Sequence, residues 1–252
     1  MIAQIKHNDT LYNVNLNLPI DLSIPIHQNG PCAWGVSKLK IEAAKQDGWV
    51  GDIQLGGAVN FNNIFFNPHA HTTHTECVGH ISPNKDSLNS ELKQFFFPSE
   101  LITVSPEKIQ NDYVITKPML EECFHNKEDV SSLIIRTLPN NKNKKRRNYS
   151  NTNPPYFLKE AIDYIVALKI EHLLIDLPSV DKEKDDGQLI SHSSFWQFPN
   201  NIRRGCTITE MIYVPEKVVD GIYLLNLQFP PFENDASPSR PLLFKLNKKI
   251  AK

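Results

Sequence analysis

The sequence predicts a single α/β domain that spans residues 1–252. Helix and strand signals alternate through the middle of the chain, and strand signals dominate both flanks. A chain of 252 residues can bury a substantial core without disulfides, and this one shows no internal repeat and no convincing linker between domains. With 40% hydrophobic residues, 22% charged residues and a net charge of -1, its composition is that of an ordinary soluble protein. We therefore expect neither nucleic acid nor a membrane as a partner.

The first third of the chain is expected to form strands. Apolar residues alternate in VNLNLPIDLSIPI (14–26), but Pro19 and Pro25 interrupt the pattern, which indicates short strands at the edge of a sheet. The stretch GGAVNFNNIFFN (56–67) predicts a strand that leads directly into a cluster of histidines. Next, DSLNSELKQFFF (86–97) opens with candidate N-cap residues and predicts a short helix.

The central part predicts two helices, each paired with a strand. TKPMLEECFH (116–125) predicts a helix with its proline in the tolerated first turn, and SSLIIRT (131–137) predicts a buried strand. PPYFLKEAIDYIVALKIEHLLIDL (154–177) predicts a helix and then a strand at 172–177. The basic segment PNNKNKKRRNYSNTNPP (139–155) is interpreted as a solvated loop, because a charge run inside a neutral chain is usually a solvated surface.

The chain is expected to lie in the cytoplasm with reduced thiols. Its N-terminus lacks the continuous apolar region of a secretory signal, and no segment approaches the roughly 20 apolar residues that a membrane span needs. The four cysteines, Cys32, Cys77, Cys123 and Cys206, lie far apart and form no C-x-x-C pair. Cys77 has no clear base partner, so it is interpreted as a packed thiol and not as a nucleophile.

Four of the nine histidines fall within NPHAHTTHTECVGH (67–80), together with one carboxylate, Glu76. They could be polar loop or core histidines, but neutral imidazole and carboxylate are also the usual ligands of zinc and related divalent metals. We therefore expect a metal site. If this stretch is a strand, His69 and His71 share one face, and a turn after them brings His74 and Glu76 toward the same point.

A second explanation of the cluster is a cupin-type jelly roll. The H-x-H-x(3,4)-E signature of that fold is present as His69, His71 and Glu76. However, Asn63 stands where the signature has a glycine, six residues before the first histidine, and nothing downstream matches the second cupin motif.

A third explanation extends beyond the cluster. THTECVGH (73–80), followed by IDLPSVD (175–181), His192 and Glu210, resembles the cyclase family of metal-dependent hydrolases, which includes bacterial kynurenine formamidase. The family motif is H-x-G-T-H-x-D-x-P-x-H, and the similarity runs from about residue 19 to near the C-terminus. This resemblance implies a compact swivelling β/β/α domain, usually a dimer, with one or two zinc or manganese ions.

The resemblance also implies roles for individual residues. Four side chains match family metal ligands, namely His74, Glu76, His192 and Glu210. His80 ends the motif and matches the family's general acid or base, and Glu210 is a second candidate for a catalytic role. Asp176 and Asp181 end a predicted buried strand, where ligand sites of α/β sheets often form, but these two are assigned to structural turns.

The chain departs from the family motif at four positions. Ala70 stands in the place of the first histidine, Thr72 replaces glycine, Glu76 replaces aspartate and Val78 replaces proline. Either a one-residue adjustment lets His71 replace the missing ligand, or one metal position is lost. We expect a single tightly held metal with His71 close to the site, because three or four of the remaining side chains and a water complete a tetrahedral zinc.

The expected function is hydrolysis of an amide, as in arylformamidases of tryptophan catabolism, or of a cyclic amide or ester, by metal-activated water. Trp34, Phe195 and Trp196 are either core residues or the apolar wall that an aromatic substrate requires. The alternative is a non-catalytic relative that lost its metal and binds a small molecule. The expected partners are a small-molecule substrate and further copies of the chain, in a homodimer or larger homo-oligomer.

Overall fold

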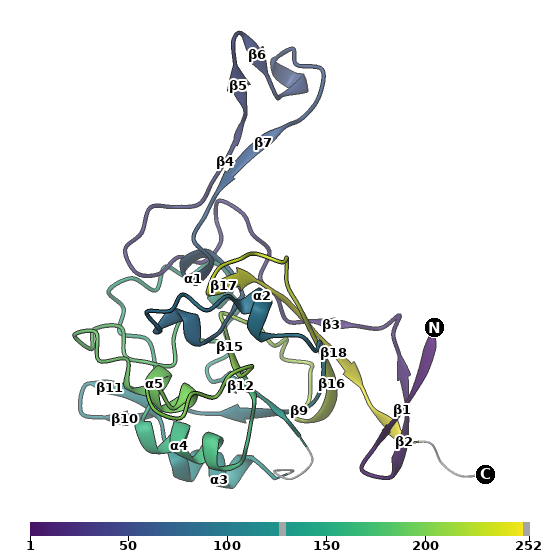
Figure 1. Ribbon diagram of the computed structural model, residues 1–252, viewed down its shortest axis with the longest axis vertical. Helices are drawn as coiled ribbons and strands as arrows, with labels where there is room; N and C mark the ends of the chain where they lie inside the picture. The colour runs from purple at the N-terminus through teal and green to yellow at the C-terminus, as the bar shows by residue number, and fades with distance from the viewer. Residues whose placement is uncertain (126–129, 249–252) are drawn as a thin grey trace.

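A computed structural model describes residues 1–125 and 130–248 and shows a mixed α/β fold on a nine-stranded sheet (Figure 1). The order across the sheet is β17 (Ala236–Pro238), β8 (His74–Glu76), β15 (Thr207–Glu210), β14 (His172–Ile175), β12 (Ser132–Thr137), β9 (Phe96–Val104), β16 (Gly221–Gln228), β18 (Arg240–Lys245) and β3 (Ile20–Asp21). The α/β class predicted from the sequence is confirmed.

The centre of the sheet is parallel and its two sides are antiparallel. Strands β15, β14, β12 and β9 run parallel to one another. Strands β8 and β17 continue the sheet antiparallel on one side, and β16, β18 and β3 continue it on the other. Strands β12, β14 and β15 are buried along their whole length, and β12 and β14 accordingly carry the apolar runs 133–135 and 173–175.

Helices cover one face of the sheet. They are α3 (Lys117–Cys123), α4 (Lys159–Ala167) and α5 (Ile190–Trp196). Leu120, Ile165 and Phe195 of these helices belong to the same buried cluster as Leu133 of β12. The next residue of that strand, Ile134, belongs to a second buried cluster with side chains of β16, so alternate residues of one strand serve two cores.

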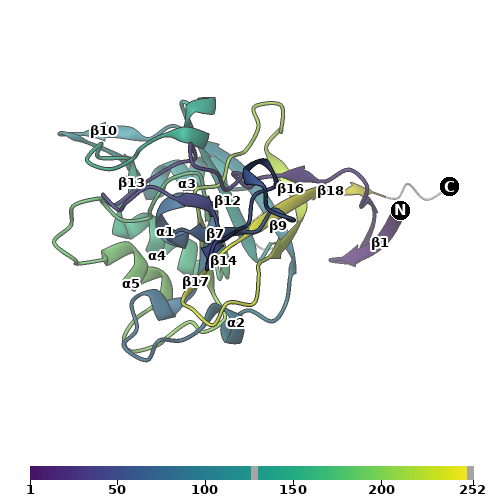
Figure 2. The same ribbon diagram turned by 90° about the horizontal axis from the view of Figure 1, so that it is seen from above.

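Smaller elements complete the fold. A hairpin of β1 (Ile2–His7) and β2 (Thr10–Asn15), extended by β19 (Asn247–Lys248), lies at one end of the molecule, and the sheet of β10 (Glu107–Ile109), β11 (Asp112–Ile115) and β13 (Tyr156–Phe157) lies toward the other (Figure 2). The short helical turns are α1 (Pro68–His71), η2 (Val78–His80), α2 (Leu88–Glu91) and η3 (Lys142–Arg146).

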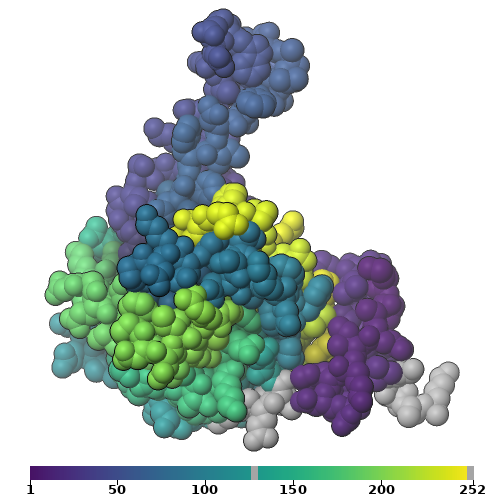
Figure 3. Space-filling model, viewed as in Figure 1, coloured from purple at the N-terminus to yellow at the C-terminus, as the bar shows by residue number. Residues whose placement is uncertain are grey.

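Residues 40–65 form an arm that projects from the body (Figures 1 and 3). It consists of β4 (Lys40–Ala43) paired with β7 (Asn62–Phe65), β5 (Lys45–Gln46) paired with β6 (Trp49–Val50), and the turn η1 (Ile53–Leu55). The arm carries large apolar side chains that are 41% to 63% exposed, namely Trp49, Ile53, Leu55, Val59, Phe61, Ile64 and Phe65.

The structure confirms the predicted helix at 116–125 as α3 and the strand at 131–137 as β12, and it corrects two other predictions. Within 86–97 only Leu88–Glu91 is helical, because the phenylalanines that follow enter β9. The basic segment is not a fully solvated loop, since Lys144 is buried and its ammonium group donates to Asp176 at 2.7 Å. Among the described residues, no helix has both the length and the apolar character that crossing a bilayer requires.

Candidate metal centre

Two neighbouring strands provide the floor of the centre. Strands β8 and β15 are antiparallel, and their register places His74 opposite Glu210 and Glu76 opposite Ile208. Residues two apart on a strand share a face, so His74, Glu76 and Glu210 project from the same side of the sheet. The residues between them, Thr75 and Thr209, share a hydrogen bond of 2.8 Å between their hydroxyls.

Helix α5 brings His192 to this floor. The carboxylate of Asp181 accepts the backbone N–H groups of Ser191 and His192 at the start of the helix, at 2.6 and 3.1 Å. The same carboxylate lies 2.7 Å from His192 Nδ1 and so orients the ring. His192 Nε2 then faces the carboxylate of Glu76, 3.1 Å from its Oε1. Asp181, predicted as a structural turn residue, therefore also positions a histidine of the centre.

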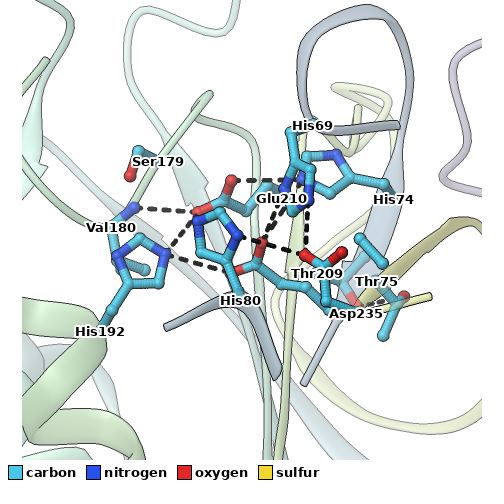
Figure 4. Close-up of polar contacts among 12 residues, drawn as sticks. His69, His74, Thr75, His80, Ser179, Val180, His192, Thr209, Glu210 and Asp235 are labelled. Carbon is cyan, nitrogen blue, oxygen red and sulfur yellow. Dashed lines mark hydrogen bonds and ion pairs between the residues drawn. The ribbon is translucent and has the colours of Figure 1, made fainter. Parts of the chain in front are cut away.

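The four side chains that the family motif marks as ligands converge (Figure 4). His74 Nε2 lies 3.4 Å from Glu210 Oε2 and 3.9 Å from Glu76 Oε2, and His192 Nε2 lies 3.8 Å from Glu210 Oε1. All four are buried. The convergence that the sequence predicted for these residues is therefore present, although His74 and His192 are far apart in the chain.

His69 is the fifth member of the group. Its Nδ1 lies 3.0 Å from Glu76 Oε2. The turn α1 positions it: the side chain of Asn67 accepts the backbone N–H of His69 at 2.9 Å, and Pro68 occupies the first position of the turn. Trp34 supports the turn by donating its indole N–H to the His69 carbonyl at 3.1 Å.

His71 does not lie in the group, contrary to its predicted role as a ligand close to the site. Its Nδ1 accepts the Asn67 N–H at 2.9 Å, and its Nε2 donates to the Ser37 carbonyl at 3.0 Å. The prediction assumed a strand, in which His69 and His71 share a face. Because residues 68–71 form a helical turn, positions two apart point in different directions, and only His69 faces Glu76.

His80 and Asp235 form the outer rim of the centre. The His80 ring stacks on the His69 ring with 4.4 Å between centroids, and its centroid is 5.3 Å from that of His192. Asp235 Oδ2 lies 2.8 Å from His69 Nε2 and 3.3 Å from His80 Nδ1. Sequence reasoning missed Asp235, which lies just before β17, outside the motif. The only signal for it was its place within the stretch that the family resemblance covers.

Gly79 allows the chain to reach His80 in this geometry. A Cβ atom at this position would lie only 1.8 Å from the Asp86 carbonyl oxygen, so no other residue fits without a backbone shift. Glycine here is therefore a requirement of the close approach between the turn η2 and the segment before α2.

Charges in the centre are strongly coupled. Burial lowers the pKa of His69, but its contacts with Asp235 and Glu76 outweigh burial and raise that pKa to about 10. Burial likewise opposes the charged form of His192, yet Asp181 and Glu76 hold its pKa well above the usual value. Burial would raise the pKa of Glu76, but the surrounding histidines hold it well below the usual value. The group therefore combines carboxylates and imidazoles at the distances of ion pairs.

The donor atoms fit a metal ion. His74 Nε2 and Glu76 Oε2 are fully buried and form no hydrogen bond of good geometry, although Glu210 Oε2 lies 3.4 Å from the first and His69 Nδ1 lies 3.0 Å from the second. Leaving buried polar atoms unpaired costs free energy, which a shared cation at this point would recover. One donor atom each of His69, His74 and Glu76 lie within 4.8 Å of one another, as do those of Glu76, His80 and His192.

Other candidate residues have structural roles. Phe195 and Trp196 are fully buried in the core, so they do not form a substrate wall; Trp196 stacks on His192 at 5.6 Å between centroids. Trp34 is 37% exposed near His69 and is accessible to a ligand.

Burial raises the pKa of the Cys77 thiol to about 12, which agrees with a packed thiol. Asp176 accepts from Thr137 and Lys144.

Comparison with known proteins identifies relatives of this chain. Residues 20–182 match the family model named Cyclase, which is described as "Putative cyclase". No curated protein matches the sequence.

Several solved structures share the fold over nearly the whole chain. One, described as a potential metal-dependent hydrolase with cyclase activity, is 17% identical, with a TM-score of 0.63 over 90% of this chain and 98% of that one. A predicted metal-dependent hydrolase from Bacillus stearothermophilus is 18% identical, with a TM-score of 0.61 and the same coverage. An isatin hydrolase bound to the product analogue thioisatinate is 15% identical, with a TM-score of 0.60 over 91% of this chain and 92% of that one.

Proposed function

Because this chain belongs to the cyclase family, we propose that it is a metal-dependent hydrolase of a small amide or of a cyclic amide or ester. Two similar folds are described as metal-dependent hydrolases, and a third as an isatin hydrolase, which supports this reaction class. The proposal depends mainly on one observation: two fully buried donor atoms that form no hydrogen bond of good geometry, His74 Nε2 and Glu76 Oε2, face the donor side chains of His69, His192 and Glu210.

The residues that would hold the metal are His69, His74, Glu76, His192 and Glu210. This set of imidazoles and carboxylates without thiolate suits zinc or manganese. The chemistry that such a metal supplies when bound is activation of water, whose pKa falls from 15.7 to about 7. The two glutamates offset the positive charge of the ion, and the family motif supplies one of them as aspartate.

His80 is the residue proposed to move protons. It sits on the exposed rim, and one of its ring nitrogens lies within 4.8 Å of the donor atoms of Glu76 and His192. Its Nδ1 is engaged by Asp235, which leaves Nε2 available to take a proton from water and return it to the leaving group. Its position next to the donor atoms, on the side open to solvent, fits a general acid or base.

The relatives of this chain and the side chains at the rim of the centre both support a class of substrate. A formamide, a lactam or a lactone each presents a carbonyl that water can attack, and the isatin hydrolase acts on an aromatic cyclic amide scaffold by its name. The exposed indole of Trp34, next to His69, provides an apolar contact for an aromatic ring. We therefore propose an aryl formamide, as in arylformamidases, or an aromatic cyclic amide as substrate.

The alternative, a non-catalytic relative with an eroded site, is based on Ala70 and Val78, which both depart from the family motif. Because His69 points into the group in place of residue 70, the number of donors is restored, and this supports a working site.

The test is hydrolysis of formyl-kynurenine, isatin and a small panel of amides, lactones and esters by purified protein with zinc or manganese. The proposal expects turnover of at least one aromatic amide that disappears with a chelator and returns with metal. Absence of both turnover and bound metal would refute it and favour the binding protein.

A further inference from the structure

Asp235 is held in place at the rim by its own backbone. Its carbonyl accepts the N–H of Cys77 at 3.0 Å, and the carbonyl of the preceding Asn234 accepts the N–H of Leu88 at 2.8 Å. These bonds tie the chain before β17 to the segment that follows β8. The position of the Asp235 carboxylate is therefore set by the backbone around it and not by the flexibility of a surface loop.

One oxygen of this carboxylate serves two rings. Asp235 Oδ2 accepts from His69 Nε2 at 2.8 Å and from His80 Nδ1 at 3.3 Å, while the two rings stack at 4.4 Å (Figure 4). His69 thus turns its other nitrogen, Nδ1, toward Glu76, and His80 keeps Nε2 free. A single carboxylate fixes the orientation of a proposed metal ligand and of the proposed acid or base together.

We propose that Asp235 is a positioning residue of the centre, which orients His69 for metal binding and His80 for proton transfer. This inference rests on the proposed function. A carboxylate behind a ligating histidine fixes the ring and its tautomer and raises its basicity as a ligand, and loss of such a partner typically weakens metal binding by about 10- to 100-fold.

The centre uses the same arrangement a second time. Asp181 stands behind His192 as Asp235 stands behind His69, with 2.7 Å between Asp181 Oδ2 and His192 Nδ1. Two histidines from different elements therefore each have a carboxylate on the side away from Glu76. This repetition is what a metal centre with supported ligands requires.

A competing role for Asp235 is that of a ligand to an outer metal, because donor atoms of His69, His80 and Asp235 also lie within 4.8 Å of one another. In that case His69 would have to serve either the outer ion or the inner group, or bind through both nitrogens as a deprotonated ring. A positioning role needs neither, since each ring nitrogen of His69 keeps one partner.

The first experiment observes ring N–H protons by NMR in protein labelled with 15N-histidine and treated with a chelator. In the wild type, the protons of His69 and His80 that face Asp235 should be shifted downfield and exchange slowly. Asp235→Ala should remove these two signals and retain that of His192, which faces Asp181; Asp181→Ala should do the reverse. Unchanged His69 and His80 signals in folded Asp235→Ala would overturn the proposal. No metal is needed, so this outcome is independent of whether the protein is a hydrolase.

The second experiment titrates metal-free protein with zinc against a chromophoric chelator. Asp235→Ala should weaken zinc binding about 10- to 100-fold without changing the number of zinc ions bound at saturation. The isosteric Asp235→Asn, which keeps an acceptor oxygen, should lose less affinity. Loss of one equivalent of zinc at saturation would make Asp235 a ligand and overturn the positioning role, as would unchanged affinity in both variants.

Discussion

At the scale of single residues, a helical turn at residues 68–71 distinguishes the centre from the family motif. Ala70 occupies the position of the first family histidine, and neither neighbour could replace it on a regular strand. Asn67 and Pro68 start a helical turn instead, and this rotates His69 toward Glu76 and His71 toward Ser37. The chain thus supplies an imidazole from position 69 where the family supplies one from position 70.

His80 is predicted to contribute to turnover and not to metal retention. His80→Ala should lower turnover about 10²- to 10⁴-fold, the usual contribution of a general acid or base, while the metal content stays near that of the wild type. Activity and metal analysis on the same preparation measure both effects. His27→Ala, which removes a histidine outside the group, is the control. Loss of the metal in His80→Ala would make His80 a ligand and contradict this role.

At the scale of elements, strand β14 carries a buried histidine whose burial makes the stability of the fold depend on pH. His172 packs against Phe97 at 4.0 Å between ring centroids, and its Nδ1 lies 2.9 Å from the Thr207 hydroxyl. Burial, assisted by the positive charge of Arg203, lowers the pKa of His172 to about 3. The strand therefore holds a neutral imidazole in its core above about pH 3.

This burial predicts a loss of stability in mild acid. Between pH 6.5 and about 3 the unfolded chain takes up a proton on His172 and the folded chain does not, so the free energy of unfolding falls as the pH falls, by up to about 1.4 kcal/mol per pH unit. Between pH 7 and pH 5 the contribution is about 2 kcal/mol. Urea unfolding with a chelator present should show this loss to be smaller by that amount in His172→Gln and unchanged in His27→Gln. An equal loss in wild type and His172→Gln would contradict the assignment.

The elements also show what could be predicted from the sequence. Continuous apolar runs predicted β12 and β14, and the first-turn proline predicted α3, because local pattern determines such elements. The residue types and the motif predicted the meeting of His74, Glu76, His192 and Glu210. The same stretch carries the signals of a helix start at Asn67 and Pro68. A strand would place His69 and His71 on one face and would not distinguish them, whereas the helical turn selects His69.

Other features depend on contacts that no local pattern reveals. Asp235 reaches the centre only because β17 pairs with β8, more than 150 residues earlier in the chain. Lys144 is buried only because Asp176, at the end of another strand, neutralises it. In both cases the sequence alone would place a charged residue on the surface. The tertiary fold instead brings it next to a polar or charged partner.

At the scale of the whole molecule, the arm presents an exposed apolar surface. A two-stranded hairpin is marginally stable alone in water, and the arm exposes seven large apolar side chains. Since every copy carries the same arm, two copies related by a twofold axis can cover each other's apolar surface. We therefore propose that the protein is a homodimer held by its arms.

Light scattering after size-exclusion chromatography tests this assembly. The wild type should elute as a dimer, and Leu55→Ser with Val59→Ser should shift the equilibrium toward the monomer at least about tenfold, because these side chains are 63% and 50% exposed on the arm. The matched control, Leu18→Ser with Val219→Ser, changes residues outside the arm that are 68% and 66% exposed, and it should leave the dimer intact. A monomeric wild type, or an arm variant that dimerises as well as the wild type, would contradict the proposal.

The fold as a whole brings a turn, two strands and a helix to one point, where we propose that a metal binds through His69 and not through His71. The most direct measurement is metal analysis, by mass spectrometry, of wild type, His69→Ala and His71→Ala purified side by side and shown to be folded. We predict bound zinc or manganese in the wild type and in His71→Ala, and its loss from His69→Ala. Retention of metal in His69→Ala, loss of metal from His71→Ala, or a wild type that binds none when supplied with either ion would contradict this assignment.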